Sequence, residues 1–193
     1  MKKYLLFTTA LFFSLQLLAQ TGLKKGDTAP GFAANDNSGK SLDLKTLLKS
    51  HKAVVLFFYR GQWCPYCNKQ IQKLQDSLQL LTDKGAYVIG VTPETADNIN
   101  KTIVKTHASF SLIQDKDYKI MKAYDVNYTV NDETFAQLKK YGIDLEKNNG
   151  NKDHVLPVPA TYVINSSGKI IYVHFDKDYT RRPSVSSLLK VLN

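Results

Sequence analysis

Residues 53–81 read AVVLFFYRGQWCPYCNKQIQKLQDSLQLL, and this stretch decides the fold. Ala53–Tyr59 is a continuous apolar run without alternation, which is typical of a strand buried on both faces of a parallel sheet. After a short turn, Cys64-Pro65-Tyr66-Cys67 opens a helix, because a proline in the first helical turn has no hydrogen-bond partner to lose. Behind it, apolar residues recur every three or four positions and predict one face packed on the sheet. These residues are Cys67, Ile71, Leu74, Leu78 and Leu81.

Cys64 and Cys67 are the two cysteines of the chain. Both fall in a first helical turn, where free N–H groups and the positive end of the helix dipole stabilise a thiolate. Two cysteines at this spacing also close a disulfide reversibly. A structural zinc site needs four ligands, and the four histidines of the chain show no paired spacing. The pattern therefore predicts a dithiol redox site that uses no metal and no cofactor.

The rest of the chain alternates strands and helices. Ala86–Val91 and Ser111–Gln114 have the composition of further parallel strands. Leu156–Asn165 and Lys169–Phe175, joined by a Ser-Ser-Gly turn, predict an antiparallel hairpin at the edge of the sheet. This order predicts an α/β fold with a mixed, mostly parallel central sheet flanked by helices.

A helix is expected between the second and third of these strands. Thr92 is placed to cap it and Pro93 to occupy its first turn, with Glu94 near the positive end of the dipole. We expect this helix to end near His107.

The segment from about residue 125 to 155 is the irregular part of the chain. It contains one expected helix, Asn131–Lys140, and too few large apolar residues for a core of its own. We therefore predict an insertion within a single domain that spans residues 21–193. Two interpretations stay open: a lid over the cysteines, or a connecting loop without a role.

The first twenty residues have the form of a secretory signal peptide. Lys2-Lys3 precede an apolar run, Tyr4–Ala19, that is short for a membrane span. We expect residues 1–20 to be removed on export to the periplasm or the cell exterior, with an uncleaved membrane anchor as the alternative. In such an oxidising compartment the chain has no cysteine left for a structural disulfide.

The formal net charge of +9 includes Lys2 and Lys3. The remaining lysines are spread along the chain, and no basic stripe interleaves with aromatic residues as a nucleic-acid surface requires. The charge is typical of solubility and excludes a nucleic-acid partner from our predictions.

A buried strand followed by WCxxC resembles the thioredoxin superfamily, and Trp63 makes the match more specific. The stretch VPATYVIN, Val158–Asn165, resembles the segment in which that superfamily carries a cis-proline facing the cysteines. The resemblance implies a cis bond before Pro159 and leaves the Val158 backbone free to pair with an extended substrate.

The stretches GVTPE, FSLIQD and AYDV further resemble the peroxiredoxins, the alkyl hydroperoxide reductase and thiol-specific antioxidant group. In their Pro-x-x-x-Thr-x-x-Cys motif, the proline falls on Arg60, the threonine on Cys64 and the attacking cysteine on Cys67. The peroxiredoxin arginine falls on Pro159, so Arg60, Arg181 or Arg182 is expected in its place. The buried aspartate of thioredoxins falls on Phe58, which leaves the proton donor for Cys67 unassigned.

These features predict a thiol–disulfide redox enzyme with two open mechanisms. In disulfide exchange Cys64 attacks and Cys67 resolves. In peroxide reduction, which the peroxiredoxin resemblance implies, Cys67 attacks and Cys64 closes the disulfide. Both need an external dithiol reductant, either a thioredoxin-like protein or a low-molecular-weight thiol, and Trp63, Arg60, Val158 and Pro159 are the expected supporting residues. The alternative is a Cu(I)-binding protein without turnover, with His154 or His174 as a third ligand.

Overall fold

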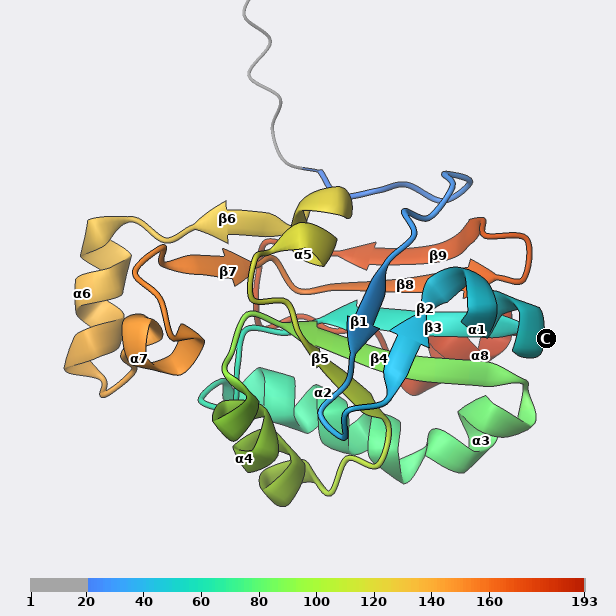
Figure 1. Ribbon diagram of the computed structural model, residues 1–193, viewed down its shortest axis with the longest axis horizontal. Helices are drawn as coiled ribbons and strands as arrows, with labels where there is room; N and C mark the ends of the chain where they lie inside the picture. Colours follow the sequence, from blue (N-terminus) through green and yellow to red (C-terminus); the bar gives the residue numbers. More distant parts are fainter. Residues whose placement is uncertain (1–20, 193) are drawn as a thin grey trace, which may run out of the picture.

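The computed structural model describes residues 21–192, and the predicted signal segment lies outside the described residues. Five strands form the central sheet in the order β5-β4-β3-β8-β9 (Figure 1). Their bounds are β3 Ala53–Phe58, β4 Ala86–Thr92, β5 Ser111–Gln114, β8 Ala160–Asn165 and β9 Ile170–Phe175. The α/β class and the central mixed sheet are confirmed.

The predicted buried strand is the middle of the sheet. Every residue of β3 is buried, and it pairs in parallel with β4 on one side and antiparallel with β8 on the other. β5 is parallel to β4, and β9 is antiparallel to β8, so four of these five strands run in the same direction. The predicted hairpin is confirmed over Ala160–Phe175, with β9 at the edge and β8 against β3. Its first strand is shorter than predicted, because Leu156 and Pro157 belong to a separate strand, β7 (Val155–Pro157), which pairs with residues 127–129.

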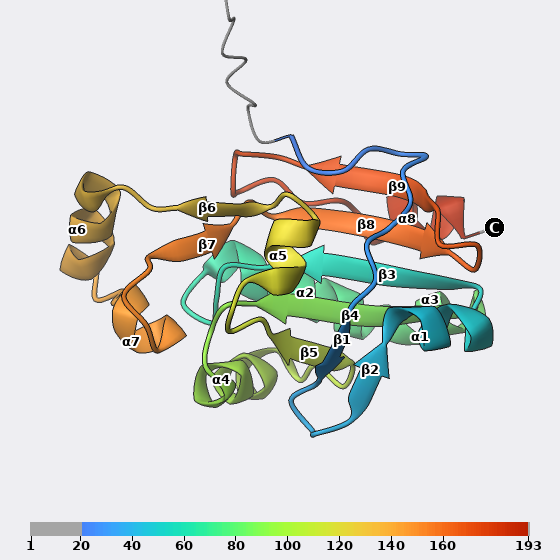
Figure 2. The same ribbon diagram turned by 45° about the horizontal axis from the view of Figure 1, so that its top comes forward.

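Helices cover both faces of this sheet (Figure 2). On one face, α1 (Leu44–Ser50) and α5 (Lys119–Ala123) pack on Leu56 and Phe58 of β3. On the other face, the apolar cluster around Val55 and Phe57 includes both cysteines. The helices of that face are α2 (Pro65–Asp76), α3 (Leu78–Asp83), α4 (Ala96–Thr106) and α8 (Val185–Val191). The alternation of β3 side chains between the two clusters follows from the two-residue period of a strand.

Two helix predictions are wrong in their bounds. The helix expected to run from the cysteines through Leu81 is broken at Ser77, and α3 continues it in a new direction with Leu81 still buried. The second helix begins at Ala96, with Thr95 as its N-cap, because Thr92 still belongs to β4 and pairs with Gln114. Its predicted end is confirmed, since His107 is the C-cap in a left-handed conformation.

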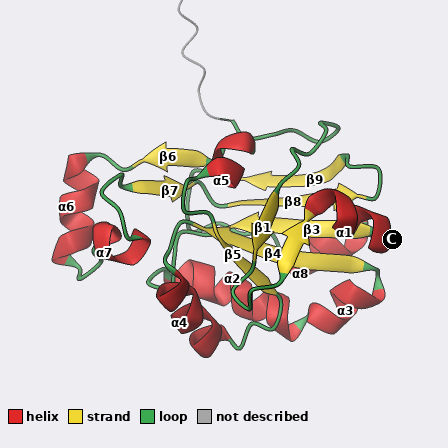
Figure 3. Cartoon of the chain, in the orientation of Figure 1, coloured by secondary structure: helices red, strands yellow, loops and turns green. Residues whose placement is uncertain are grey.

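The insertion is built on a two-stranded ribbon and two short helices (Figure 3). β6, Asn127–Thr129, pairs antiparallel with β7, Val155–Pro157. The expected helix is α6, Asp132–Lys140, and the Asn131 side chain caps it. α7, Leu145–Asn149, follows, and Figures 1 and 2 place both helices beyond one end of the main sheet. A small apolar cluster of Val130, Leu145 and Leu156 holds these parts together.

A further ribbon of β1, Ala33–Asn35, and β2, Ser41–Asp43, precedes α1. No helix among residues 21–192 is long and apolar enough to cross a membrane.

Candidate active site

The two cysteines lie where β3 gives way to α2. Cys64 is the N-cap of α2 and Cys67 lies in its first turn, and the side chains of both are fully buried as free thiols. The turn before them is held by hydrogen bonds from the Cys64 N–H to the Gly61 carbonyl, 3.1 Å, and from Asn68 Nδ2 to the Gln62 carbonyl, 2.8 Å. The sequence prediction that both sulfurs occupy one helical turn is therefore confirmed.

The two thiols have opposite electrostatics. A hydrogen bond from the Cys67 side chain lowers the pKa of Cys64 to about 6 against the cost of burial, with help from the positive charges of Arg60 and Arg182. Burial raises the pKa of Cys67 well above its ordinary value, and its hydrogen bond to Cys64 raises it further. Near neutral pH the pair therefore carries one negative charge, placed on Cys64.

Arg60 is held in place by aromatic rings. Only 9% of its surface is exposed, and its guanidinium carbon lies 4.8 Å from the centre of the Trp63 ring and 4.0 Å from that of Tyr179. Burial raises the pKa of the Tyr128 hydroxyl, and the nearby charge of Arg60 opposes this rise. This stacking fixes a cation beside Cys64.

Arg182 is the arginine that reaches the second sulfur. Its Nη2 lies 3.5 Å from Cys67 Sγ, whereas Arg181 pairs with Asp176 and Asp178 at 3.6 and 3.2 Å. Sequence reasoning left this choice open, because two consecutive arginines differ only in the direction in which the folded chain points them.

The expected cis bond at Pro159 is wrong. Residues 21–192 contain no cis peptide bond, and Val158 is 4% exposed. Its N–H donates to the Val126 carbonyl at 2.7 Å and is not free for a substrate strand. The Val158 N–H is occupied because Val126, at the start of the insertion, takes the backbone position expected for a substrate strand. Pro159 instead borders a hollow of about 340 Å³ with Tyr128, Lys177 and Tyr179.

A buried carboxyl group that the sequence analysis assigned to a helix dipole lies behind the catalytic turn. Glu94 is fully buried, and its Oε2 accepts a hydrogen bond from the Gln62 N–H at 2.7 Å. Burial raises the pKa of this carboxyl group to about 8. The signal that could have identified it is a glutamate two residues after an apolar strand, but the same pattern is also typical of a helix start.

The insertion forms a wall beside the cysteines. A hollow of about 380 Å³ lies between the catalytic turn, at Arg60, Trp63 and Tyr66, and the insertion, at Tyr128 and Leu138. The segment thus contributes to the surroundings of the dithiol as one wall of a groove beside this turn.

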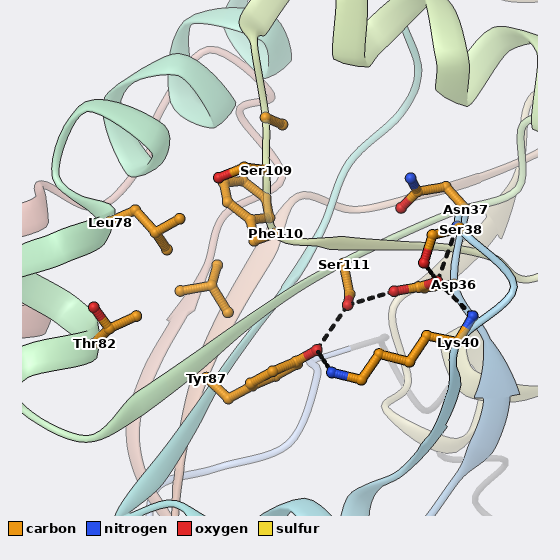
Figure 4. Close-up of a pocket in the computed structure, with 12 residues that line it drawn as sticks. Asp36, Asn37, Ser38, Lys40, Leu78, Thr82, Tyr87, Ser109, Phe110 and Ser111 are labelled. Atoms are coloured by element: carbon orange, nitrogen blue, oxygen red, sulfur yellow. Dashed lines mark hydrogen bonds between the residues drawn. The ribbon is translucent and has the colours of Figure 1, made fainter.

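A second hollow, of about 430 Å³, lies near α3, the helix that follows the far end of α2 from the cysteines (Figure 4). There Lys40 Nζ donates to the Tyr87 hydroxyl at 3.1 Å, that hydroxyl is 2.9 Å from Ser111 Oγ, and Ser111 donates to Asp36 at 2.7 Å. This chain of bonds satisfies its own polar atoms and ties the β1–β2 loop to the sheet, without a sulfur in reach.

The Cu(I) alternative gains no third ligand from His154. Its Nε2 is 3.1 Å from Glu146 Oε1, and its ring stacks on Phe135 at 3.8 Å. Within residues 21–192 no group of three or more histidine, cysteine or acidic side chains is arranged to hold a metal ion.

A buried parallel strand, a helix that starts with a dithiol and a thiolate stabilised at the helix N-terminus define a thioredoxin-fold, thiol-dependent oxidoreductase. The AhpC/TSA family model matches residues 25–173, so the chain belongs to the AhpC/TSA family, the peroxiredoxins.

The relatives agree with this assignment. The chain is 27% identical over 146 residues to a putative peroxiredoxin bcp of Helicobacter pylori (strain J99), covering 76% of this chain and 84% of that protein. It is 31% identical over 170 residues to the chloroplastic peroxiredoxin Q of Populus jackii, covering 88% and 68%.

Solved structures show the same fold. Peroxidoxin BcpB from Mycobacterium tuberculosis superposes with a TM-score of 0.68 at 20% identity, covering 88% of this chain and 96% of that one. The thioredoxin domain of a thiol-disulfide oxidoreductase from Bacteroides vulgatus superposes with a TM-score of 0.59 at 18% identity, covering 89% and 99%.

Proposed function

We propose that this chain reduces hydroperoxides with its own dithiol and that Cys64 is the attacking sulfur. The observation that carries the proposal is the Cys64 thiolate, because its pKa of about 6 makes it the charged nucleophile near neutral pH. Membership of the peroxiredoxin family and the peroxiredoxin names of its relatives support a peroxide as the substrate.

The reaction balances over the two cysteines. The Cys64 thiolate attacks the terminal oxygen of ROOH, the O–O bond breaks, and RO⁻ leaves and takes a proton from solvent, so that Cys64 becomes a sulfenic acid. Cys67 then attacks the Cys64 sulfur, the S–O bond breaks, and water leaves with the proton released by Cys67. An external dithiol, a thioredoxin-like protein or a small thiol, returns two electrons and restores both thiols.

Cys64 is buried, so a substrate reaches its sulfur only when side chains of the turn move aside. The groove lined by Trp63 and Tyr66 adjoins this turn, and its aromatic wall suits an organic hydroperoxide as well as hydrogen peroxide.

Two single variants test the order of attack. In Cys67→Ser, peroxide should leave a sulfenic acid on Cys64 that dimedone traps and peptide mass spectrometry locates. In Cys64→Ser, peroxide consumption should fall to the level of an ordinary buried thiol. Rapid peroxide consumption by Cys64→Ser, with dimedone on Cys67, would overturn the proposal. Cys67 would then be the attacking cysteine, as the peroxiredoxin motif implies.

Disulfide exchange is the second candidate function. The neutral Cys67 thiol beside a Cys64 thiolate is the arrangement that attack on a substrate disulfide and resolution of the mixed disulfide require. In this case Cys67→Ser should accumulate a mixed disulfide on Cys64 when mixed with an oxidised protein substrate, and turnover with peroxide should stay low.

Export of the chain is also a proposal. It is supported by Lys2-Lys3 and the apolar run to Ala19. Intact-mass analysis of the exported fraction should find a chain without about the first twenty residues. A mass that retains Met1–Ala19 in a membrane fraction would point to the anchored alternative.

A further inference from the structure

A hollow of about 300 Å³ lies between α2 and the segment that leads into α8, and the proposed reaction does not yet use it. Three cationic side chains line it, those of Lys69, Lys73 and Arg182, and its lining contains no acidic side chain. We call it the cationic hollow. Its volume is at the lower end of the range of small-molecule sites, and its charge favours an anionic occupant.

The two lysines of the cationic hollow lie one turn apart on α2, and both are exposed. Neither ammonium group makes a hydrogen bond or an ion pair with any residue among 21–192. Like charges at this spacing repel one another and destabilise a helix. An occupant with two carboxylates offsets this repulsion, because each ammonium group then has a counter-charge.

Gln70 gives the cationic hollow a hydrogen-bond acceptor. Its side chain is only 6% exposed, and its Nε2 donates to Thr161 Oγ1 of β8 at 3.2 Å. Its Oε1 is buried and has no partner in the described part of the chain, although the residue lines the hollow. A buried acceptor of this kind is satisfied by a donor from an occupant. The hollow therefore suits a molecule that carries N–H groups beside its carboxylates, as a small peptide does.

Arg182 connects the cationic hollow to the dithiol. Its Nη2 lies 3.5 Å from Cys67 Sγ. Its Nη1 donates to the Tyr179 and Arg181 carbonyl groups, both at 2.6 Å, which holds the guanidinium group in place. Tyr66, which stands between the two cysteines in the sequence, also lines the hollow. An anion bound there therefore lies beside the dithiol.

We propose that the cationic hollow binds the external reductant, and that this reductant is a small peptide-like thiol with carboxylate groups. Its carboxylates pair with Lys69 and Lys73, one of its N–H groups donates to Gln70 Oε1, and its sulfur reaches Cys67 beside Arg182. The inference rests on the dithiol chemistry of the proposed function and names the class of thiol that restores both cysteines.

The reduction balances over two molecules of this thiol. The first thiolate attacks Cys67 Sγ of the oxidised dithiol, a new S–S bond forms, and the Cys64–Cys67 bond breaks with its electron pair on Cys64. Cys64 is the better leaving sulfur, because its pKa of about 6 stabilises the departing thiolate. A second thiolate attacks the peptide sulfur of this mixed disulfide and releases the peptide disulfide, and Cys67 takes a proton from solvent.

The first test compares wild type with two double variants. Lys69→Gln/Lys73→Gln removes both ammonium groups of the hollow. Lys45→Gln/Lys49→Gln is the matched control, because it removes another exposed pair one turn apart, on α1 at the other face of the sheet. Protein oxidised with diamide is mixed with glutathione, which has two carboxylates, or with uncharged dithiothreitol. The fluorescence of Trp63, the single tryptophan, follows reduction in a stopped-flow instrument.

The measured quantity is the ratio of the glutathione rate to the dithiothreitol rate. At low ionic strength this ratio should fall about 10-fold in Lys69→Gln/Lys73→Gln and keep its wild-type value in the control. Added salt should lower the wild-type ratio toward that of the Lys69→Gln/Lys73→Gln variant. An unchanged ratio in that variant, or an equal fall in the control, would overturn the inference.

Two further outcomes separate this inference from neighbouring proposals. The protein is oxidised with diamide, so a protein that turns over no peroxide but shows the expected ratios would refute the peroxide proposal and support the inference. If the two lysines mattered for reduction by a thioredoxin-like protein and not for reduction by glutathione, the hollow would be a protein-docking surface, and the inference would be wrong.

A second measurement detects binding without reduction. The probe is S-methylglutathione, which keeps both carboxylates and the amide groups but cannot exchange with a disulfide. Added to ¹⁵N-labelled oxidised protein, it should shift the side-chain amide signal of Gln70 and the backbone signals of residues 66–73 and 182–188 until they saturate. The dissociation constant should rise about 10-fold in Lys69→Gln/Lys73→Gln. The absence of a saturable shift, or shifts centred on the hollow at Lys40 and Tyr87, would contradict the proposal.

Discussion

The hydrogen bond from Cys67 to Cys64 can be removed or kept by a choice of two substitutions. Cys67→Ala removes the donor, while Cys67→Ser keeps a hydroxyl group at the same position. Both variants retain a single cysteine, so any thiolate signal belongs to Cys64.

The size of the effect follows from the structure. The pKa of Cys64 is lowered from 9.0 to about 6, and the hydrogen bond from Cys67 is the largest cause. A hydrogen bond to a charged group contributes about 1.5–3 kcal/mol, which equals about 1–2 pKa units. We therefore expect a pKa of about 7–8 for Cys64 in Cys67→Ala and one close to 6 in Cys67→Ser.

The assay is the pH dependence of iodoacetamide alkylation, checked by the ultraviolet absorbance of the thiolate. At pH 7 the thiolate fraction should be roughly 0.9 in the Ser variant and roughly 0.1–0.5 in the Ala variant. A midpoint near 6 in Cys67→Ala would refute the assignment of the hydrogen bond as the main cause, and leave Arg60 and the helix N-terminus in its place. A midpoint near 9 in Cys67→Ser would refute the Cys64 thiolate itself.

Three further predictions concern the surroundings of the dithiol. Arg182→Gln should raise the pKa of Cys64 and slow its alkylation at pH 7. Arg181→Gln should not, because the Arg181 side chain pairs with aspartates. Equal effects of the two substitutions would contradict the 3.5 Å contact between Arg182 and Cys67. Gly61→Ala should lower the free energy of unfolding by about 1–3 kcal/mol in urea titrations, because its Cβ would collide with Glu94, and unchanged stability would be evidence against that packing. The folded-state pKa of Glu94 is raised from 4.5 to about 8, so the wild type loses stability as pH rises from about 4.5 to 8. Glu94→Gln should remove this loss, and the difference in unfolding free energy between the two proteins should grow by about 5 kcal/mol over that range. A difference that does not change with pH would contradict the prediction.

The sequence alone determined the central strand of the protein and the helical turn that carries both sulfurs. The unbroken apolar run Ala53–Tyr59 predicted a strand buried on both faces, and β3 is the middle of the sheet. The spacing of Cys64 and Cys67 placed both sulfurs in one helical turn, as observed. These inferences succeeded because they depend on periodicity and on first-turn chemistry, which are local properties of the chain.

The sequence alone could not predict which side chains from distant segments lie beside the two sulfurs. Arg182 lies 115 positions from Cys67, and nothing in the stretch around Arg181 and Arg182 distinguishes the two before the chain folds. The cis bond expected before Pro159 was wrong, and the expected free N–H of Val158 donates to the carbonyl of Val126, a partner from a distant segment that no local pattern indicates.

Glu94 shows most clearly the difference between what the sequence predicts and what the tertiary structure decides. In the sequence it follows Thr92 and Pro93, and local rules place such a glutamate in the exposed first turn of a helix. In the structure β4 continues through Thr92 and the helix starts at Ala96, so Glu94 turns inward behind Gly61 and Gln62. Local propensities set the elements and the dithiol of this protein, whereas the burial and charge of the groups around the sulfurs depend on which segments the tertiary structure packs against them.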